Sequence, residues 1–326
     1  FVTNGYVSPE YFCDREKETA KIVSLLTNEN NIALISPRRL GKTDLLRHCF
    51  GQPEIKEHYH TFIIDIYATS SVRDFVNVFG KAVLDELRPK GKSVWGTFLN
   101  VLASLRSEIT FDMNGQPTWG IGLGAITNPS ATLDEIFSYL NNAGKPCLIA
   151  IDEFQQITKY ADDPNIEAAL RTHIQRCSNA HFVFSGSHRH LMGAMFTSPA
   201  RPFYQSVTLI NLPPISVDKY AEFCLKHFER VSKHLDTLVV TELYERFNGI
   251  TSYMQKVMNI LFSMTGTGEI CIPSMIDTAI NDLLDFSADT YDALLYQMPE
   301  KQRIVFMAIA AEGKAKAISS GDFVRK

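Results

Sequence analysis

The sequence predicts an α/β fold in which five parallel strands form one sheet with helices on both faces. Short apolar runs, typical of buried parallel strands, alternate with segments of helical spacing over residues 1–212. The first apolar run is followed by a loop that ends in Gly41-Lys42-Thr43. From residue 213 to residue 297 only helical patterns occur. We therefore expect an α/β domain at 1–212 and an all-helical domain at 213–297.

The expected elements follow one another along the chain. The strands are Ile32–Ile35, Thr61–Tyr67, Cys147–Ile151, Ala180–Phe184 and Val207–Leu212. Helices are expected around residues 19–26 and at 44–50, 72–87, 95–105, 132–140 and 166–177. After the boundary at Pro213-Pro214, helices are expected at 216–231, 237–247, 251–264 and 273–297.

Residues 107–126 differ from their surroundings. They alternate loosely between polar and apolar residues, are rich in glycine, and contain Asn114-Gly115. This pattern predicts a β-hairpin inserted into the α/β domain. We expect it to be structural or to face a partner rather than to take part in chemistry.

The segment around Gly41-Lys42-Thr43 has the order strand, loop, GK[ST] and helix that a phosphate-binding loop requires. Loop amides and the positive end of the helix would face an anion, Lys42 would reach the β- and γ-phosphates, and Thr43 would bind Mg²⁺. Ser36 replaces the first glycine of G-x-x-x-x-G-K-[ST]. The residues expected to hold the nucleotide form one run: Pro37, Arg38, Arg39, Leu40, Gly41, Lys42, Thr43 and Asp44.

Arg38 and Arg39 add positive charge near the entrance of this loop. Contact of either arginine with an adjacent domain or partner is an equal alternative. Arg201, between the fourth and fifth strands, is either a surface arginine or one that reaches a γ-phosphate in a neighbouring subunit.

The third expected strand is apolar throughout and ends in Asp152-Glu153. Two carboxylates at the end of a parallel strand suit phosphate chemistry, since Asp152 can hold the Mg²⁺ and Glu153 can orient or deprotonate the attacking water. Ser185 ends the next strand and would touch either the γ-phosphate or that water, unless it is only a turn residue.

Four motifs together resemble the archaeal-type ATPase family, a member of the STAND branch of AAA+ P-loop ATPases that also occurs in bacteria. They are residues 12–18, 36–43, 149–154 and 184–187. The resemblance implies that Phe12 to Arg15 lie by the adenine, and that residues 36–43, Asp152-Glu153 and Ser185 are the Walker A, Walker B and sensor-1 positions.

The resemblance also covers residues 248–255, which match a segment that lies over the nucleotide in this family. The resemblance implies that Tyr253 lies over the nucleotide. Ser252 stands where the family pattern has proline. Many AAA+ proteins have an arginine on this helix, and here the nearby candidates are Gln255 and Lys256. These departures, like Ser36, favour slow turnover.

Pro299 begins another helical pattern, followed by a short basic strand-like segment at Lys314–Ile318 and the start of a further helix. This order predicts the beginning of a truncated winged helix at 298–326. DNA binding through it has little support, because only four basic residues follow residue 313. The partner stays open among a second copy of the chain, another protein and DNA.

The 326 residues are 45% hydrophobic with a net charge of −4, which excludes a strongly basic nucleic-acid-binding surface over the whole molecule. The six scattered cysteines are expected to be buried thiols. No apolar run approaches the about 20 residues that cross a bilayer, and no signal-peptide pattern opens the chain, so a cytoplasmic location without membrane contact is expected.

These observations lead to one main functional hypothesis: a slow molecular switch that binds and hydrolyses ATP to ADP with Mg²⁺, coupling nucleotide state to movement of the helical lid and winged helix. Two alternatives remain. One is an adaptor, nucleotide-locked or associated with DNA, without useful hydrolysis. The other is a P-loop kinase for small molecules, which would not release phosphate steadily without an acceptor.

Overall fold

The computed structural model describes residues 1–3, 5–87, 110–111, 117–118, 129–313 and 320–321. Its centre is a five-stranded parallel sheet in the order β2-β5-β6-β1-β7. The strands are β1 (Ile32–Ile35), β2 (His60–Asp65), β5 (Cys147–Asp152), β6 (Ala180–Gly186) and β7 (Thr208–Asn211). All five predicted strands are therefore confirmed, with bounds that differ by no more than two residues at either end.

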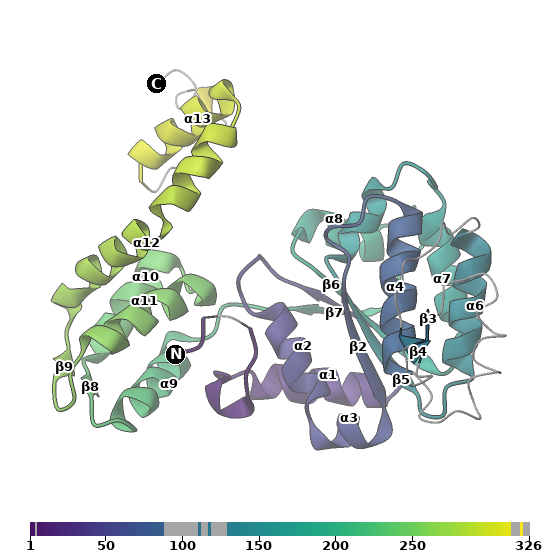
Figure 1. Cartoon of the computed structure of the whole chain (residues 1–326), viewed down its shortest axis with the longest axis horizontal. Helices are drawn as coiled ribbons and strands as arrows, with labels where there is room; N and C mark the ends of the chain where they lie inside the picture. Colours follow the sequence, from purple (N-terminus) through teal and green to yellow (C-terminus); the bar gives the residue numbers. More distant parts are fainter. Residues whose placement is uncertain (4, 88–109, 112–116, 119–128, 314–319, 322–326) are drawn as a thin grey trace.

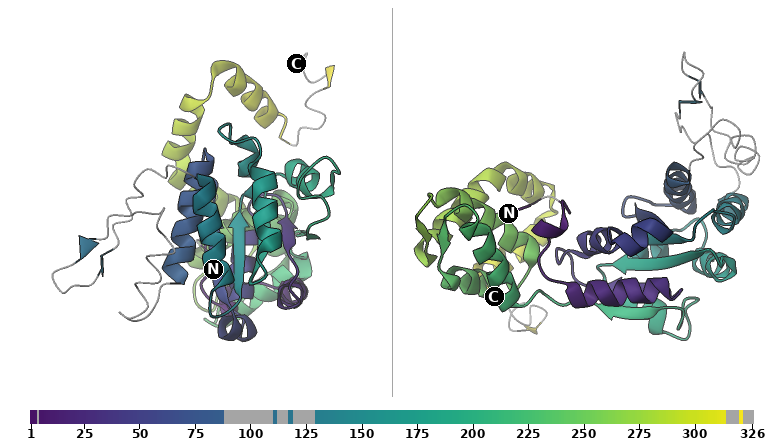
Figure 2. Two further views of the ribbon diagram at one scale, coloured as in Figure 1. Left: turned by 90° about the vertical axis from the view of Figure 1, so that its right-hand side faces the viewer. Right: turned by 90° about the horizontal axis from the view of Figure 1, so that it is seen from below.

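Helices cover both faces of this sheet (Figures 1 and 2). One face carries α1 (Glu16–Thr27), α2 (Lys42–Phe50) and α3 (Pro53–His58), and the other carries α4 (Val72–Glu86), α6 (Pro129–Asn141), α7 (Ile166–Arg176) and α8 (Arg189–Thr197). Successive side chains of a strand point to opposite faces. Accordingly, Ile32 and Leu34 pack with the first group of helices, and Ala33 and Ile35 with the second.

Helices α3 and α8 were not predicted. Helix α3 has six residues and starts two residues after the C-cap of α2 at Gly51, so it is too short to show a period. Helix α8 buries Met192, Met195 and Phe196, a helical spacing that the sequence does contain, although Gly193 lies within it.

The predicted hairpin is confirmed in part. Strands β3 (Thr110–Phe111) and β4 (Pro117–Thr118) pair in antiparallel fashion. The Asn114-Gly115 turn, the predicted helix at 95–105 and the basic segment Lys314–Ile318 lie outside the described residues.

The C-terminal part is helical, as predicted. It contains α9 (Val217–Glu229), α10 (Thr237–Phe247), α11 (Thr251–Met264) and α12 (Ile276–Gln297), and α12 extends upward beyond the other three helices to α13 (Glu300–Ala311) (Figure 1). The short parallel pair β8 (His234–Leu235) and β9 (Ile270–Cys271) was not predicted. We call α9, α10, α11 and α12 the lid. The boundaries at residues 212, 297 and 298 stay predictions.

The first residues of the chain pack on the lid rather than on the sheet. The ring of Phe1 contacts those of Phe228 and Phe262, and Cys13 joins the core of the lid. The amide of Asn259 donates to the carbonyl oxygen of Phe1 at 2.8 Å. This N-terminal segment, residues 1–13 with the turn η1 (Pro9–Tyr11), therefore ties the lid to the start of α1.

All six cysteines are buried and free, as predicted, and burial raises the pKa of Cys13 and of Cys49 to about 12. Their thiols are therefore protonated at neutral pH and weak nucleophiles. None of the helices in the described part of the chain combines the length and apolar character needed to cross a membrane.

Four histidines should make the protein less stable as the pH falls from 7.5 to 5.5. Burial lowers the pKa values of His48, His173, His181 and His227 below that of an exposed histidine. Across this window the unfolded chain binds more protons than the folded one, so the free energy of unfolding rises with pH and falls on acidification. Urea unfolding at the two pH values measures the difference.

The variant His181→Gln should reduce that difference, whereas His58→Gln, at an exposed position in α3, should leave it unchanged. Equal stability of the wild-type protein at both pH values would contradict the lowered pKa values of the four histidines.

Candidate functional site

The loop between β1 and α2 has the backbone of a phosphate-binding loop. Arg39 (φ 70°) and Gly41 (φ 84°) both have left-handed backbone angles, and a side chain at position 41 would be strained. Helix α2 begins at Lys42, so its unpaired N-terminal amides face the loop. Ser36 is fully buried and its hydroxyl donates to the carbonyl oxygen of Pro37 at 3.0 Å. The serine in place of glycine is thus accommodated at the corner between strand and loop.

Lys42 closes the loop on itself. Its ammonium donates to the carbonyl oxygens of Ser36 at 3.1 Å and Pro37 at 3.3 Å. Burial lowers the pKa of Lys42, while the carboxylates of Asp152 and Glu153 oppose this shift. The ammonium therefore lies in a site that penalises its charge unless an anion joins it.

Asp152 connects three elements. Its Oδ2 accepts a hydrogen bond from the hydroxyl of Thr43 at 2.5 Å, and its Oδ1 accepts one from the hydroxyl of Ser185 at 2.6 Å. The register of β5 on β6 pairs Ile151 with Phe184, which places the next residue of each strand side by side. The predicted Walker A threonine, Walker B aspartate and sensor-1 serine thus form one continuous polar chain.

Glu153 follows at the end of β5 with a left-handed backbone angle, φ 56°, before the turn η3 (Phe154–Lys159). Phe154 is fully buried, and this anchors the backbone next to the carboxylate. The Oε2 of Glu153 accepts hydrogen bonds from the hydroxyl of Ser187 at 2.8 Å and from the amide of Gln155. Its Oε1 lies 4.0 Å from the Nε of Arg38.

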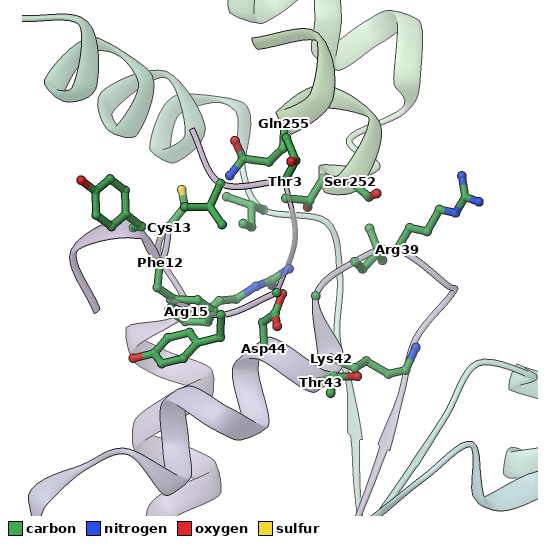
Figure 3. Close-up of a pocket in the computed structure, with 18 of the residues that line it drawn as sticks. Thr3, Phe12, Cys13, Arg15, Arg39, Lys42, Thr43, Asp44, Ser252 and Gln255 are labelled. Atoms are coloured by element: carbon green, nitrogen blue, oxygen red, sulfur yellow. The ribbon is translucent and has the colours of Figure 1, made fainter. Parts of the chain in front are cut away.

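A pocket of about 340 Å³ lies where the loop, the N-terminal segment and the lid meet. In Figure 3, Thr3, Ser252 and Gln255 lie on the side of the pocket opposite Lys42 and Thr43. Of the predicted site residues, those lining the pocket are Phe12, Arg15, Arg38, Arg39, Leu40, Gly41, Lys42, Thr43, Asp44, Asp152 and Glu153. Those not lining it are Pro37, Ser185, Arg201 and Tyr253.

One wall of the pocket is aromatic. The ring of Phe12 stacks on the imidazole of His48, with 4.3 Å between the centroids, and the hydroxyl of Tyr6 lies 3.1 Å from Nδ1 of His48. Arg15 is buried, and its guanidinium donates to Glu18 at 2.9 Å and to the carbonyl oxygen of Pro213 at 2.7 Å. Arg15, the N-cap of α1, thus contacts the segment that leads from the sheet into the lid.

Arg39 contacts the lid. Its guanidinium lies 4.7 Å from the centroid of the Tyr253 ring, and its carbonyl oxygen accepts a hydrogen bond from the backbone N–H of Ser252 at 3.2 Å. Figure 3 shows the side chain of Arg39 extending away from Lys42. Of the two alternatives for this arginine, the structure supports contact with the adjacent domain.

Arg201 forms an ion pair with Glu167 at the start of α7. Burial raises the pKa of Glu167, and Arg201 opposes that shift. The guanidinium is therefore occupied within its own chain, and its reach into a neighbouring subunit stays a prediction.

The sequence did not indicate several residues of this site, including Thr3, Tyr6 and His48, and it gave Ser187 no role although that residue belongs to the motif 184–187. Residues 1–13 carry neither a strand nor a helix period, so nothing places them over the loop. Gln255, in contrast, was named from the resemblance of the lid segment, and it lines the pocket.

Family models match most of the chain. One described as "ATPase domain predominantly from Archaea" matches residues 12–257. Another, described as "Probable winged helix domain", matches residues 289–326 and so begins inside α12, before the predicted boundary at residue 298. Among curated proteins, none matches the sequence.

Solved structures share the fold. The Walker-type ATPase of Pyrococcus abyssi aligns with a TM-score of 0.60 at 17% identity, covering 94% of this chain and 80% of that one. The Aeropyrum pernix ORC1 protein, solved in complex with DNA, aligns with a TM-score of 0.56 at 13% identity, covering 95% of this chain and 75% of that one. The ADP form of the Aeropyrum pernix ORC2 protein aligns with a TM-score of 0.56 at 13% identity, covering 99% of this chain and 80% of that one.

At these identities the structural likeness shows the fold, which is that of P-loop ATPases. The family match covers well over half of the sequence and includes the loop, Asp152-Glu153 and Ser185. The chain belongs to the family of ATPase domains that occur predominantly in Archaea.

Proposed function

We propose that this chain is a slow molecular switch that binds ATP with Mg²⁺ in the pocket and hydrolyses it to ADP and phosphate. The observation that carries the proposal is the hydrogen-bonded chain Thr43–Asp152–Ser185, which joins the loop, β5 and β6 directly beside Glu153. It combines an anion-binding loop, oxygen ligands and a carboxylate at one end of the sheet, as phosphoanhydride hydrolysis requires.

Thr43 and Asp152 are the residues that would hold Mg²⁺. Their oxygens lie 2.5 Å apart. No group of three or more metal-binding His, Cys, Asp or Glu side chains occurs among the described residues. A pair of oxygen donors still fits Mg²⁺, which commonly takes one or two protein ligands and completes its shell with water and phosphate. When bound, the ion would neutralise charge on the phosphate oxygens.

Glu153 would act on the attacking water. Its carboxylate accepts a proton as the water oxygen bonds to the γ-phosphorus, and the bond from that phosphorus to the bridging oxygen breaks. The electron pair of that bond goes to ADP, and the other product is inorganic phosphate. Lys42 would exchange the carbonyl oxygens of Ser36 and Pro37 for phosphate oxygens.

Phosphate release from ATP by the purified chain tests the proposal. We expect slow, continuous release with Mg²⁺ that stops when the ion is chelated and resumes when it is restored. Release that is undetectable, or unaffected by chelation, would contradict it.

The contact between Arg39 and Tyr253 supports a lid that moves with nucleotide state. If the lid must sit on the loop to bind ATP, Tyr253→Ala should weaken ATP binding by about two- to fivefold, the range expected for a partly exposed cation–π contact. Tyr253→Phe keeps the ring and should bind as the wild-type protein does. Titration of each variant with ATP measures the difference, and equal affinities for all three proteins would contradict the coupling.

One observation favours the adaptor alternative. Both Ser187 and Gln155 already donate to Glu153, so the carboxylate is occupied in this conformation. A chain that never releases Glu153 would bind nucleotide and hold it, presenting the lid and the winged helix to a partner. The Glu153→Gln variant described in the Discussion separates the two functions.

A further inference from the structure

The two adjacent arginines of the phosphate loop point to different parts of the molecule. Arg39 is engaged by Tyr253 of the lid. Arg38 instead lies over the ends of the strands, with its Nε 3.4 Å from the hydroxyl of Ser187 and 4.0 Å from Oε1 of Glu153. Its guanidinium carbon lies 5.0 Å from the centroid of the Tyr67 ring.

Arg38 is a largely exposed cation of the site, held by one long hydrogen bond, one long ion pair and the ring of Tyr67. The described lining of the pocket includes four cationic residues, of which Arg15 is buried on Pro213 and Glu18. Lys42 donates to loop carbonyls, and Arg39 stacks on the lid. The side chain of Arg38 is 53% exposed, and its contacts with Ser187 and Glu153 are long. It can therefore exchange partners at little cost.

We propose that Arg38 is a catalytic arginine supplied in cis, whose guanidinium moves from Glu153 to the γ-phosphate when ATP binds. This inference rests on the proposed ATPase function. The γ-phosphate carries more negative charge than one carboxylate and offers paired oxygens, which match the fork of a guanidinium. The exchange loosens the hold on Glu153 as charge on the transferred phosphate is neutralised.

The location of Arg38 explains how one chain can supply this charge alone. The backbone of Arg38 belongs to the loop that would surround the phosphates, so its side chain needs no second subunit to reach them. Arg201, the other candidate for this role, forms an ion pair with Glu167 and does not line the pocket. Turnover per chain should therefore not depend on the concentration of the chain.

The test compares Arg38→Ala, Arg38→Lys and Arg176→Ala with the wild-type chain. Arg176 is an exposed arginine at the end of α7, near the amino end of β6 and away from the loop. Affinity for ATP and for ADP is measured by titration, and phosphate release is measured over a range of chain concentrations.

We expect Arg38→Ala to weaken ATP binding about tenfold or more, because a charged hydrogen bond to the γ-phosphate is lost, and to leave ADP binding unchanged. Phosphate release should fall about 10³-fold or more, the effect of losing a catalytic arginine in related chemistry. Arg38→Lys keeps the charge but not the fork, and should recover part of the ATP affinity and less of the rate. Arg176→Ala should behave as the wild-type chain.

Equal losses of ATP and ADP affinity would overturn the inference, since Arg38 would then serve the shared phosphates or the loop itself. Unchanged affinities and rate would overturn it as well. Turnover that rises with chain concentration and is lost in Arg201→Ala would assign the role to Arg201 of another copy. A wild-type chain that binds neither nucleotide would instead refute the ATPase proposal itself.

Discussion

Replacing Glu153 with glutamine should lower the rate of phosphate release by about 10²- to 10⁴-fold, the usual contribution of a general base. Glutamine has nearly the same shape and can still contact Ser187, but it cannot accept the proton of the attacking water. The affinity for ATP should stay within a few-fold of wild type, since Glu153 holds no phosphate. Steady-state phosphate release and ATP titration on the same preparation measure both quantities.

The matched control is Glu57→Gln, an exposed substitution in α3 that should change neither quantity. If Glu153→Gln releases phosphate at the wild-type rate, Glu153 is not the base. The adaptor function would then be favoured, and the phosphate release that is observed would have to depend on another residue.

Replacing Lys42 with alanine should weaken binding of both ATP and ADP by about 10- to 100-fold, in line with the loss of charge-assisted hydrogen bonds to phosphate. The same substitution should change the stability of the folded chain little. Two loop hydrogen bonds disappear, but so does the cost of burying an ammonium whose pKa is already lowered.

Thermal unfolding and nucleotide titration of Lys42→Ala should therefore diverge, with binding lost and stability nearly retained. The exposed Lys56→Ala is the control for loss of a lysine. An ATP affinity equal to that of the wild-type chain would show that the loop is not the phosphate site.

Elements that bury a periodic apolar pattern could be predicted from the sequence. Strands β1 and β5 are continuous apolar runs with every residue buried, and helices α9, α10 and α11 bury residues at helical spacing, so burial specifies them. The short pair β8 and β9 has two residues in each strand, which is too few to show a period. Strands β3 and β4 confirm the pairing of the predicted hairpin, and its turn lies outside the described residues.

The contacts within the candidate site were predictable only where sheet topology dictates them. Asp152 and Ser185 meet because both lie at the carboxyl ends of neighbouring parallel strands. Arg38 and Arg39 are adjacent in sequence, yet one lies at the strand ends and the other at the lid. Such a division depends on the left-handed backbone at Arg39 and on tertiary packing, which no local pattern records. Phe12 and Arg15 were named from the family resemblance and line the pocket, whereas Thr3 and Tyr6, which also line it, were missed for the same reason.

The most direct test of the account is a calorimetric titration of the purified chain with ATP and with ADP in the presence of Mg²⁺. The account predicts one bound nucleotide per chain for each ligand in the wild-type protein, and a strong loss of both in Lys42→Ala. Failure of the folded wild-type chain to bind either nucleotide at millimolar concentration would contradict it.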